Sequence, residues 1–111
     1  MGAITTHILD TTRGRPAPDV VVELEFEDDG WDSVGTGETN ADGRVQGLLG
    51  TSPLRQGTYR LRFHVGQYFT TLGTAAFYPY VEIVFQVHAT DEHYHVPLLL
   101  NPFGYATYRG S

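Results

Sequence analysis

The residues of this chain that could carry chemistry are histidines and one arginine in or beside strand-like segments. His7 lies in ITTHILD, His93 and His95 lie two apart in HYHVPLLLN, and Arg44 directly follows the turn-forming sequence NADG. A neutral histidine can take a proton from water near pH 7, and a guanidinium can stabilise the negative charge that develops on an attacked carbonyl oxygen. If the fold brings these side chains together, the sequence predicts hydrolysis by activated water.

Each of these residues also has a simpler interpretation. A single histidine on a strand is more often a packing or surface residue than a catalytic one, and Arg44 would ordinarily be a solvated cation after the Asp42-Gly43 turn. Sequence spacing does not decide between the two interpretations. The chain has no cysteine and no G-x-S-x-G sequence, so a covalent acyl-enzyme mechanism has little support.

A metal site is the other chemistry that these histidines could support. His93 and His95 could chelate a metal from one strand face, with His7 as a third ligand. No carboxylate stands at a fitting position, and the absence of cysteine excludes a thiolate zinc site. We therefore expect neither a metal nor another cofactor.

Alternation of apolar and polar residues is the main structural signal. It runs through residues 19–27, 58–65 and 80–88, with Gly, Pro, Asn and Asp between the runs. Strands of this length and spacing predict an all-β chain folded as an antiparallel two-sheet sandwich. Residues 65–74, VGQYFTTLGT, instead have apolar residues at helical spacing and predict one short helix that ends at Gly73. We expect residues 1–111 to form a single domain.

The first and the penultimate strands carry apolar residues on both faces. His7 and Leu9 share the face of ITTHILD opposite the core, as His95 and Leu99 do in HYHVPLLLN. An outer face that mixes histidine with leucine predicts a subunit interface. Pro97 cannot donate a backbone hydrogen bond, so we expect a sheet edge or a bulge there.

Charge and composition restrict the possible partners. Thirteen acidic residues against seven arginines, with no lysine, give a formal charge of -6. This charge argues against nucleic acid as a partner. No apolar run reaches the roughly 20 residues that a membrane span needs, and the start of the chain does not resemble a secretory signal. We expect a cytoplasmic protein.

Four segments of the sequence together resemble one known family. HYHVPLLLNPFGYATYRGS at residues 93–111 resembles the carboxy-terminal signature of the transthyretin-related proteins, the 5-hydroxyisourate hydrolases. THILDTTRGRPAPDVVVELE resembles their amino-terminal signature, and TNADGRV and FYPYVEIVF resemble two internal blocks in the same order. The resemblance covers essentially the whole chain.

The resemblance implies a fold, an assembly and a reaction. The family fold is a transthyretin-like sandwich with one short helix, and its members are homotetramers with active sites at the dimer-dimer interface. The family reaction is hydrolysis of 5-hydroxyisourate to 2-oxo-4-hydroxy-4-carboxy-5-ureidoimidazoline. Carried over by position, the resemblance implies catalytic roles for His7, Arg44, His95 and Ser111, and substrate contacts from His7, Arg44, Tyr108, Arg109 and Gly110.

Two alternatives to the hydrolase stay open at this point. The same fold also serves as a small-molecule carrier, and a fold does not decide a function. The carrier branch lacks both histidines and the arginine, which this chain keeps. The other alternative is a structural module that uses its apolar outer face only to bind partners.

Overall fold

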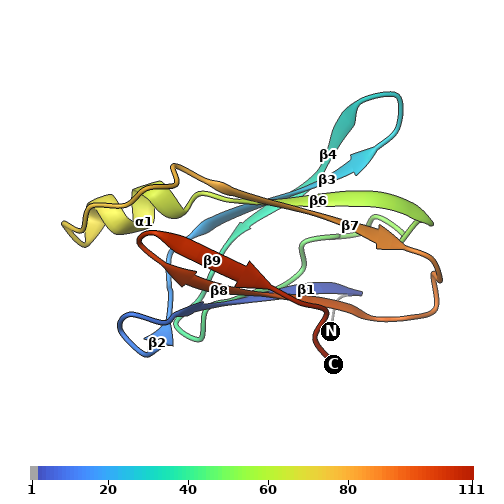
Figure 1. Cartoon of the computed structure of the whole chain (residues 1–111). Helices are drawn as coiled ribbons and strands as arrows, with labels where there is room; N and C mark the ends of the chain where they lie inside the picture. The colour runs from blue at the N-terminus through green and yellow to red at the C-terminus, as the bar shows by residue number, and fades with distance from the viewer. Residues whose placement is uncertain (1–2) are drawn as a thin grey trace.

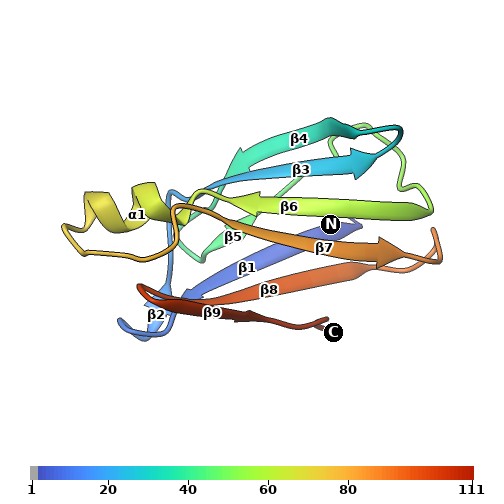
Figure 2. The ribbon, with the colours of Figure 1, turned by 45° about the horizontal axis from the view of Figure 1, so that its top comes forward.

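Two stacked β-sheets and one short helix make up the fold in a computed structural model that describes residues 3–111. Figures 1 and 2 show the sheets facing each other, with the helix at one end. One sheet has the order β2-β1-β8-β9, with β5 also paired to β1, and the other has the order β4-β3-β6-β7. The elements are β1 (Ile4–Asp10), β2 (Arg15–Pro16), β3 (Val21–Glu27), β4 (Trp31–Glu38), β5 (Arg44–Val45), β6 (Gly57–Phe63), α1 (Val65–Thr71), β7 (Val81–Val87), β8 (Tyr94–Asn101) and β9 (Gly104–Thr107). The predicted sandwich with one short helix is confirmed.

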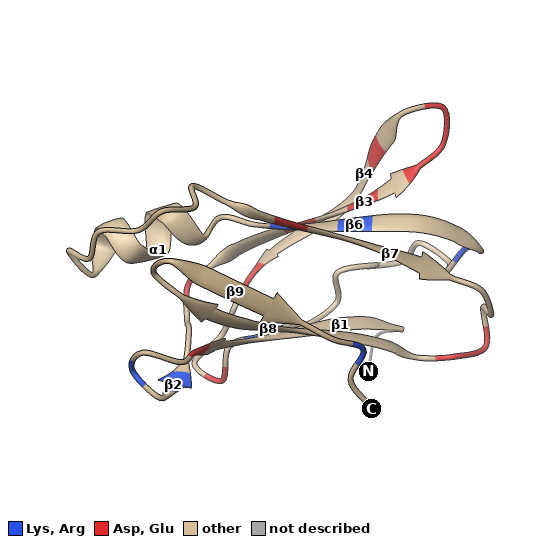
Figure 3. Cartoon of the chain, viewed as in Figure 1, with Lys and Arg blue, Asp and Glu red and all other residues tan. Residues whose placement is uncertain are grey.

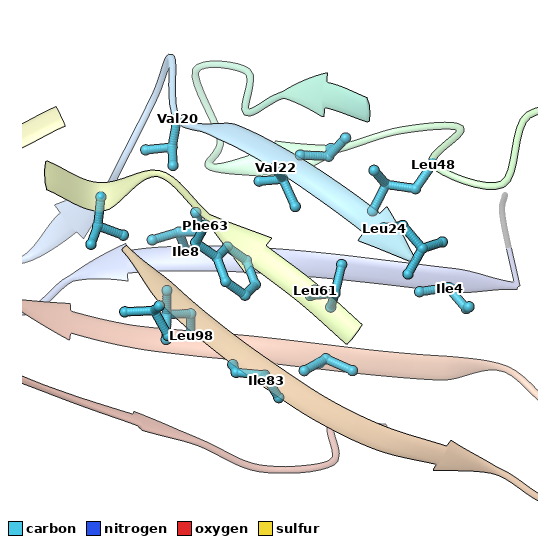
Figure 4. Close-up of a cluster of buried hydrophobic side chains, with 14 of the residues drawn as sticks. Ile4, Ile8, Val20, Val22, Leu24, Leu48, Leu61, Phe63, Ile83 and Leu98 are labelled. Carbon is cyan, nitrogen blue, oxygen red and sulfur yellow. The ribbon is translucent and has the colours of Figure 1, made fainter. Parts of the chain in front are cut away.

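The core lies between the sheets and is built from the inward rows of the alternating strands. The three runs with clear alternation form β3, β6 and β7, and each buries alternate side chains, except that Phe85 of β7 is only half-buried. In Figure 4 the inward side chains of both sheets meet in one layer, among them Ile8 of β1, Leu61 of β6 and Leu98 of β8. All three are fully buried. Burial of such side chains is the main stabilising contribution to the fold.

The central strands of the first sheet, β1 and β8, are parallel. Ile4 pairs with Tyr94, and the register continues without a break to Asp10 and Leu100. The expected sandwich was antiparallel throughout, and this pair is the exception. Parallel neighbours need a long connection, and here almost the whole chain runs between the two strands. The buried hydroxyl of Thr6 donates to the carbonyl of Val96 at 2.6 Å and helps to hold the register.

Pro97 lies inside the sheet, between β1 and β9. Regular pairing of β8 with β9 ends at Leu98 and Thr107, and one further bridge joins His95 to Gly110 in the same register. The ladder is therefore interrupted opposite Pro97, which has no N–H to donate, but it contains no bulge there. The Thr107 hydroxyl donates to the Pro97 carbonyl at 2.7 Å across the interruption.

The outer faces of the two sheets differ in charge. Arg60 and Arg62 of β6 form ion pairs with glutamates of β3 and β7, at distances that include 2.8 Å to Glu25 and 2.7 Å to Glu82. In Figure 3 this sheet carries blue and red positions, whereas β8 and β9 are mostly uncoloured. The outer face of β1 and β8 instead carries half-buried Thr5, His7, Leu9, His95 and Leu99, as the alternation predicts. Within residues 3–111 there is no helix long and apolar enough to cross a membrane.

The helix α1 ends as the sequence predicts. Gly73 has a φ of +71°, and the N–H groups of Gly73 and Thr74 donate to the carbonyls of Thr70 and Phe69. This is the Schellman arrangement that closes many helices at a glycine. The helix buries Val65, Tyr68 and Phe69.

A buried carboxylate connects α1 to the end of β1. Asp10 is 1 % exposed, and its Oδ2 accepts a 2.8 Å hydrogen bond from the Tyr68 hydroxyl. Its Oδ1 accepts from the backbone N–H groups of Thr12 and Arg13, which shapes the turn after β1. Burial and the bond to Asp10 raise the pKa of Tyr68. The hydrogen bond therefore joins two ionisable side chains, those of Asp10 and Tyr68, in the interior.

Replacement of this tyrosine tests the connection. In Tyr68→Phe, Oδ2 of Asp10 stays buried but loses its donor, so we expect the free energy of unfolding to fall by about 1–3 kcal/mol. Urea denaturation at one fixed protein concentration measures it as a lower midpoint with an unchanged slope. Tyr105→Phe, at an exposed tyrosine of β9, is the matched control and should change stability by less than about 0.5 kcal/mol. Equal midpoints for the two variants would contradict the role of the Asp10 bond.

Candidate functional site

A groove on the outer face of the β1–β8 sheet contains most of the predicted catalytic residues. Its volume is about 910 Å³. Of the predicted residues it is lined by Arg44, His95 and Ser111. The other lining residues are Thr5, Thr6, Val45, Gln46, Gly47, Gly50 and His93. His7 does not line the groove but lies on the same outward face of β1, two residues from Thr5.

Strand pairing places Arg44 beside His7. The two residues are cross-strand partners in the antiparallel pair of β1 and β5. The NADG turn prepares this pair, because the Asn40 side-chain oxygen accepts from the N–H groups of Asp42 and Arg44. Gly43 has a φ of +73°, and a Cβ there would stand 2.5 Å from the carbonyl oxygen of Ile8. The turn therefore needs glycine at this position to lie so close to β1.

The ring of His95 is held on both edges. Its Nδ1 lies 2.8 Å from the Thr5 hydroxyl, on the paired strand β1. On the other edge, a Cβ added to Gly110 would stand only 2.5 Å from Cδ2 of the ring. The Gly110 N–H also donates to the His95 carbonyl at 2.8 Å. The last residues of the chain thus pack against the candidate base.

Both histidines on this face favour the neutral form. Burial lowers the pKa of His7, and the Arg44 guanidinium lowers it further, against the opposing effect of Asp42. Burial is also the main cause that lowers the pKa of His95, followed by the positive charges of Arg44, His93 and His7. A histidine that is neutral near pH 7 can accept a proton, so this environment suits a general base.

Two of the predicted substrate-binding residues line a different groove. Tyr108 and Arg109 line a second groove, with Ile83 and Phe85 of β7. The Arg109 guanidinium lies over the Tyr94 ring, 4.5 Å from its centroid, and pairs with Glu92 at 3.0 Å. The structure brings Ser111 and Gly110 to the histidines. Arg109 reaches only the backbone carbonyl of His93, to which it donates at 3.3 Å, and neither Tyr108 nor Arg109 lines the groove.

The histidines do not form a metal cluster. Among residues 3–111 no group of three or more His, Cys, Asp or Glu side chains is arranged to hold a metal ion. The Thr5 hydroxyl lies between Nε2 of His93 and Nδ1 of His95, and the two rings are nearly parallel with centroids 6.4 Å apart. Nε2 of His93 and Nδ1 of His95 are therefore both hydrogen-bond partners of the Thr5 hydroxyl.

Sequence reasoning missed Thr5 and the segment from Gln46 to Gly50 as parts of the site. Thr5 shares the outward face of β1 with His7, and this alternation was the available signal. The segment after β5 gave no such signal, because it has no alternation. It borders the groove because buried Leu48 and Leu49 anchor it to the core.

The comparisons with known proteins agree with this architecture. The HIUase/Transthyretin family model matches residues 4–110. The chain belongs to this family. A 5-hydroxyisourate hydrolase of Salmonella dublin is 46% identical over 109 residues, which cover 97% of this chain and 80% of that protein.

The similar solved structures include a 5-hydroxyisourate hydrolase and a transthyretin in complex with thyroxine. Sea bream transthyretin in complex with thyroxine has a TM-score of 0.93 and 32% identity, covering 98% of this chain and 95% of that one. The Klebsiella pneumoniae 5-hydroxyisourate hydrolase has a TM-score of 0.85 and 35% identity, covering 97% and 92%. The backbone is thus close to both kinds of protein, and the function has to be argued from the site.

Gly110 offers a test of how His95 is held. In Gly110→Ala the new methyl group would collide with the imidazole, so we expect the ring to move away from Thr5. NMR of the histidine ring signals should show a large change for His95. Gly104→Ala is the matched control, because a Cβ there would meet only the Asn101 side chain at 3.7 Å or more. Unchanged His95 signals in Gly110→Ala would show that the ring is not clamped as described.

The pKa shifts give a second prediction. We expect NMR titration to place the pKa values of His7 and His95 below the ordinary value of about 6.5, and to show the ordinary value in urea. Arg44→Gln should raise the pKa values of His7 and His95 toward the ordinary value without reaching it, since burial still lowers both. The folded state then binds fewer protons than the unfolded state between the lowered and the ordinary pKa, so stability should rise with pH across that window. Folded-state values at or above the urea values would contradict the described environment.

Proposed function

We propose that this chain hydrolyses 5-hydroxyisourate to 2-oxo-4-hydroxy-4-carboxy-5-ureidoimidazoline in urate breakdown. The observation that carries the proposal is the placement of His7, Arg44 and His95 on one outer face, two of them lining one groove with Ser111. The Salmonella and Klebsiella relatives named as 5-hydroxyisourate hydrolases support it. The proposal needs no metal or cofactor, and it treats residues 1–111 as one domain.

The proposed chemistry is attack by water on a ring amide. Neutral His95 takes a proton from a water molecule while the water oxygen bonds to the carbonyl carbon. Arg44 donates to the carbonyl oxygen as it becomes negative, and the paired donors of its guanidinium suit an oxygen-rich heterocycle. The carbon–nitrogen bond of the ring then breaks, and the proton on His95 passes to the leaving nitrogen. His7 and Ser111 orient the water and the substrate.

We also propose that the protein acts as a cytoplasmic homotetramer with its sites at the dimer-dimer interface. Leu9 and Leu99 support this, because they lie half-buried beside the histidines on the outward face of β1 and β8. A second subunit would cover them and close the groove. In such an assembly Tyr108 and Arg109 could reach the substrate of another subunit's site.

A carrier is the second candidate function, because the fold is so similar to that of the sea bream transthyretin with thyroxine.

One experiment distinguishes the hydrolase from the carrier. 5-Hydroxyisourate is generated in place from urate and urate oxidase, and its absorbance is followed by rapid mixing with and without this protein. We expect substoichiometric protein to accelerate the decay. Decay at the spontaneous rate with folded protein would refute the hydrolase and leave the carrier as the leading function.

The role of the proposed base is tested by His95→Gln. Loss of a general base should lower kcat by roughly 10²–10⁴-fold. Light scattering should show the same assembly as for the unaltered protein. His88→Gln is the matched control, since His88 is an exposed histidine after β7 and should keep full turnover. Turnover in His95→Gln equal to that of the control would remove His95 from the mechanism.

A further inference from the structure

The Thr5 hydroxyl is a hydrogen-bond partner of two histidines at once. Its oxygen lies 2.8 Å from Nδ1 of His95 and 3.0 Å from Nε2 of His93. All three residues line the same groove, and all three are half-buried. The parallel pairing of β1 with β8 sets Thr5 directly opposite His95. The contact is therefore fixed by the sheet rather than by a mobile loop.

One hydroxyl has one hydrogen to donate, and this couples the two rings. A neutral histidine carries a proton on only one of its two ring nitrogens. In one arrangement Nδ1–H of His95 donates to Thr5, and the Thr5 O–H donates to Nε2 of His93. In the reverse arrangement Nε2–H of His93 donates to Thr5, and Thr5 donates to Nδ1 of His95. Of these two arrangements, the first leaves Nε2 of His95 free to accept a proton and the second does not.

The role of His95 as a base selects the first arrangement. Burial and the charges of Arg44, His93 and His7 lower the pKa of His95 and favour the neutral ring. A neutral ring has one nitrogen without a proton. Because Nδ1 lies against the Thr5 hydroxyl, Nε2 is the nitrogen left to accept a proton from water when Nδ1 carries the hydrogen. Gly110 lies near the opposite edge of the ring, at Cδ2, so the hydrogen bond to Thr5 is what orients Nδ1 toward β1.

We propose that Thr5 is a positioning residue that holds His95 with its proton on Nδ1, and that His93 completes the chain by accepting from the Thr5 hydroxyl. This proposal rests on the proposed function, because it assigns Nε2 of His95 as the basic nitrogen of the hydrolase. The partner of the second ring nitrogen commonly selects the tautomer of a functional histidine. Here a neutral hydroxyl and a second histidine take the place of the usual carboxylate or carbonyl.

The first test compares Thr5→Val with Thr5→Ser. Valine keeps the shape of threonine but has no hydroxyl, whereas serine keeps the hydroxyl. Partners that orient metal-bound histidines commonly contribute about 10–100-fold. We expect an effect of the same order here, so Thr5→Val should lower kcat with little change in KM. Thr5→Ser should retain most of the turnover. Equal losses in both variants, or no loss in Thr5→Val, would overturn the proposal.

The second test reads the tautomer directly and needs no substrate. Nitrogen-15 NMR of the imidazole rings separates a protonated from an unprotonated ring nitrogen. We expect His95 to carry its proton on Nδ1 in the unaltered protein and in Thr5→Ser, and to lose this preference in Thr5→Val. A proton on Nε2 of His95 in the unaltered protein would overturn the proposal even if the protein hydrolyses 5-hydroxyisourate. Conversely, an inactive protein with the proton on Nδ1 would refute the proposed function but leave the hydrogen-bonded chain intact.

His93 is tested by replacing its imidazole with a side chain that cannot accept a hydrogen bond and with one that can. In His93→Phe the Thr5 hydroxyl loses its acceptor and is free to donate to Nδ1 of His95, which favours the wrong tautomer. In His93→Gln the side-chain oxygen can still accept. We expect a lower kcat and an altered His95 tautomer in His93→Phe, with recovery in His93→Gln. An unchanged His95 tautomer in His93→Phe would remove His93 from the chain.

Discussion

The parallel pairing of β1 with β8 is the constraint on which the rest of the structure depends. One face of this pair supplies the core with Ile4, Ile8 and Leu98. The other face sets Thr5 opposite His95 and His7 opposite Pro97. A shift of the register by one residue would move each side chain to the wrong face, and it would destroy the core and the groove together. The stability of the core and the geometry of the site therefore require the same register of β1 with β8.

The two sheets use their outer faces in different ways. The β4-β3-β6-β7 sheet covers its outer face with arginine–glutamate pairs, which are partly buried against one another and disfavour face-to-face association through their charge. The β1–β8 face keeps histidine, threonine and leucine in a half-buried state and carries few charges (Figure 3). Burial is the main cause of the lowered pKa values of His7 and His95, and Arg44 is the largest charge effect on both.

Local patterns in the sequence predict much of this structure. Alternation predicts the buried rows and places His7 and His95 on the outward face, and the VGQYFTTLGT segment predicts α1 with its end at Gly73. The direction of β8 relative to β1 does not follow from either strand alone, because pairing is decided by how the entire chain packs. The same holds for the Thr5–His95 contact and for the position of Gly110 against the His95 ring, which join residues far apart in the chain or across an interrupted ladder. Side-chain direction at Tyr108 and Arg109 depends on where β9 ends, and no local pattern predicts it.

The long separation between β1 and β8 has a consequence for how the protein reaches its active form. During synthesis β1 leaves the ribosome well before β8, its parallel neighbour, whereas its partners β2 and β5 follow it sooner. Contacts of such high sequence separation slow folding, and the edge of β1 that later pairs with β8 is a template for aggregation in the meantime. The β3, β4, β6 and β7 strands are linked in local antiparallel pairs and can assemble earlier. Formation of the histidine face is then a late event, so catalytic competence marks the completion of folding.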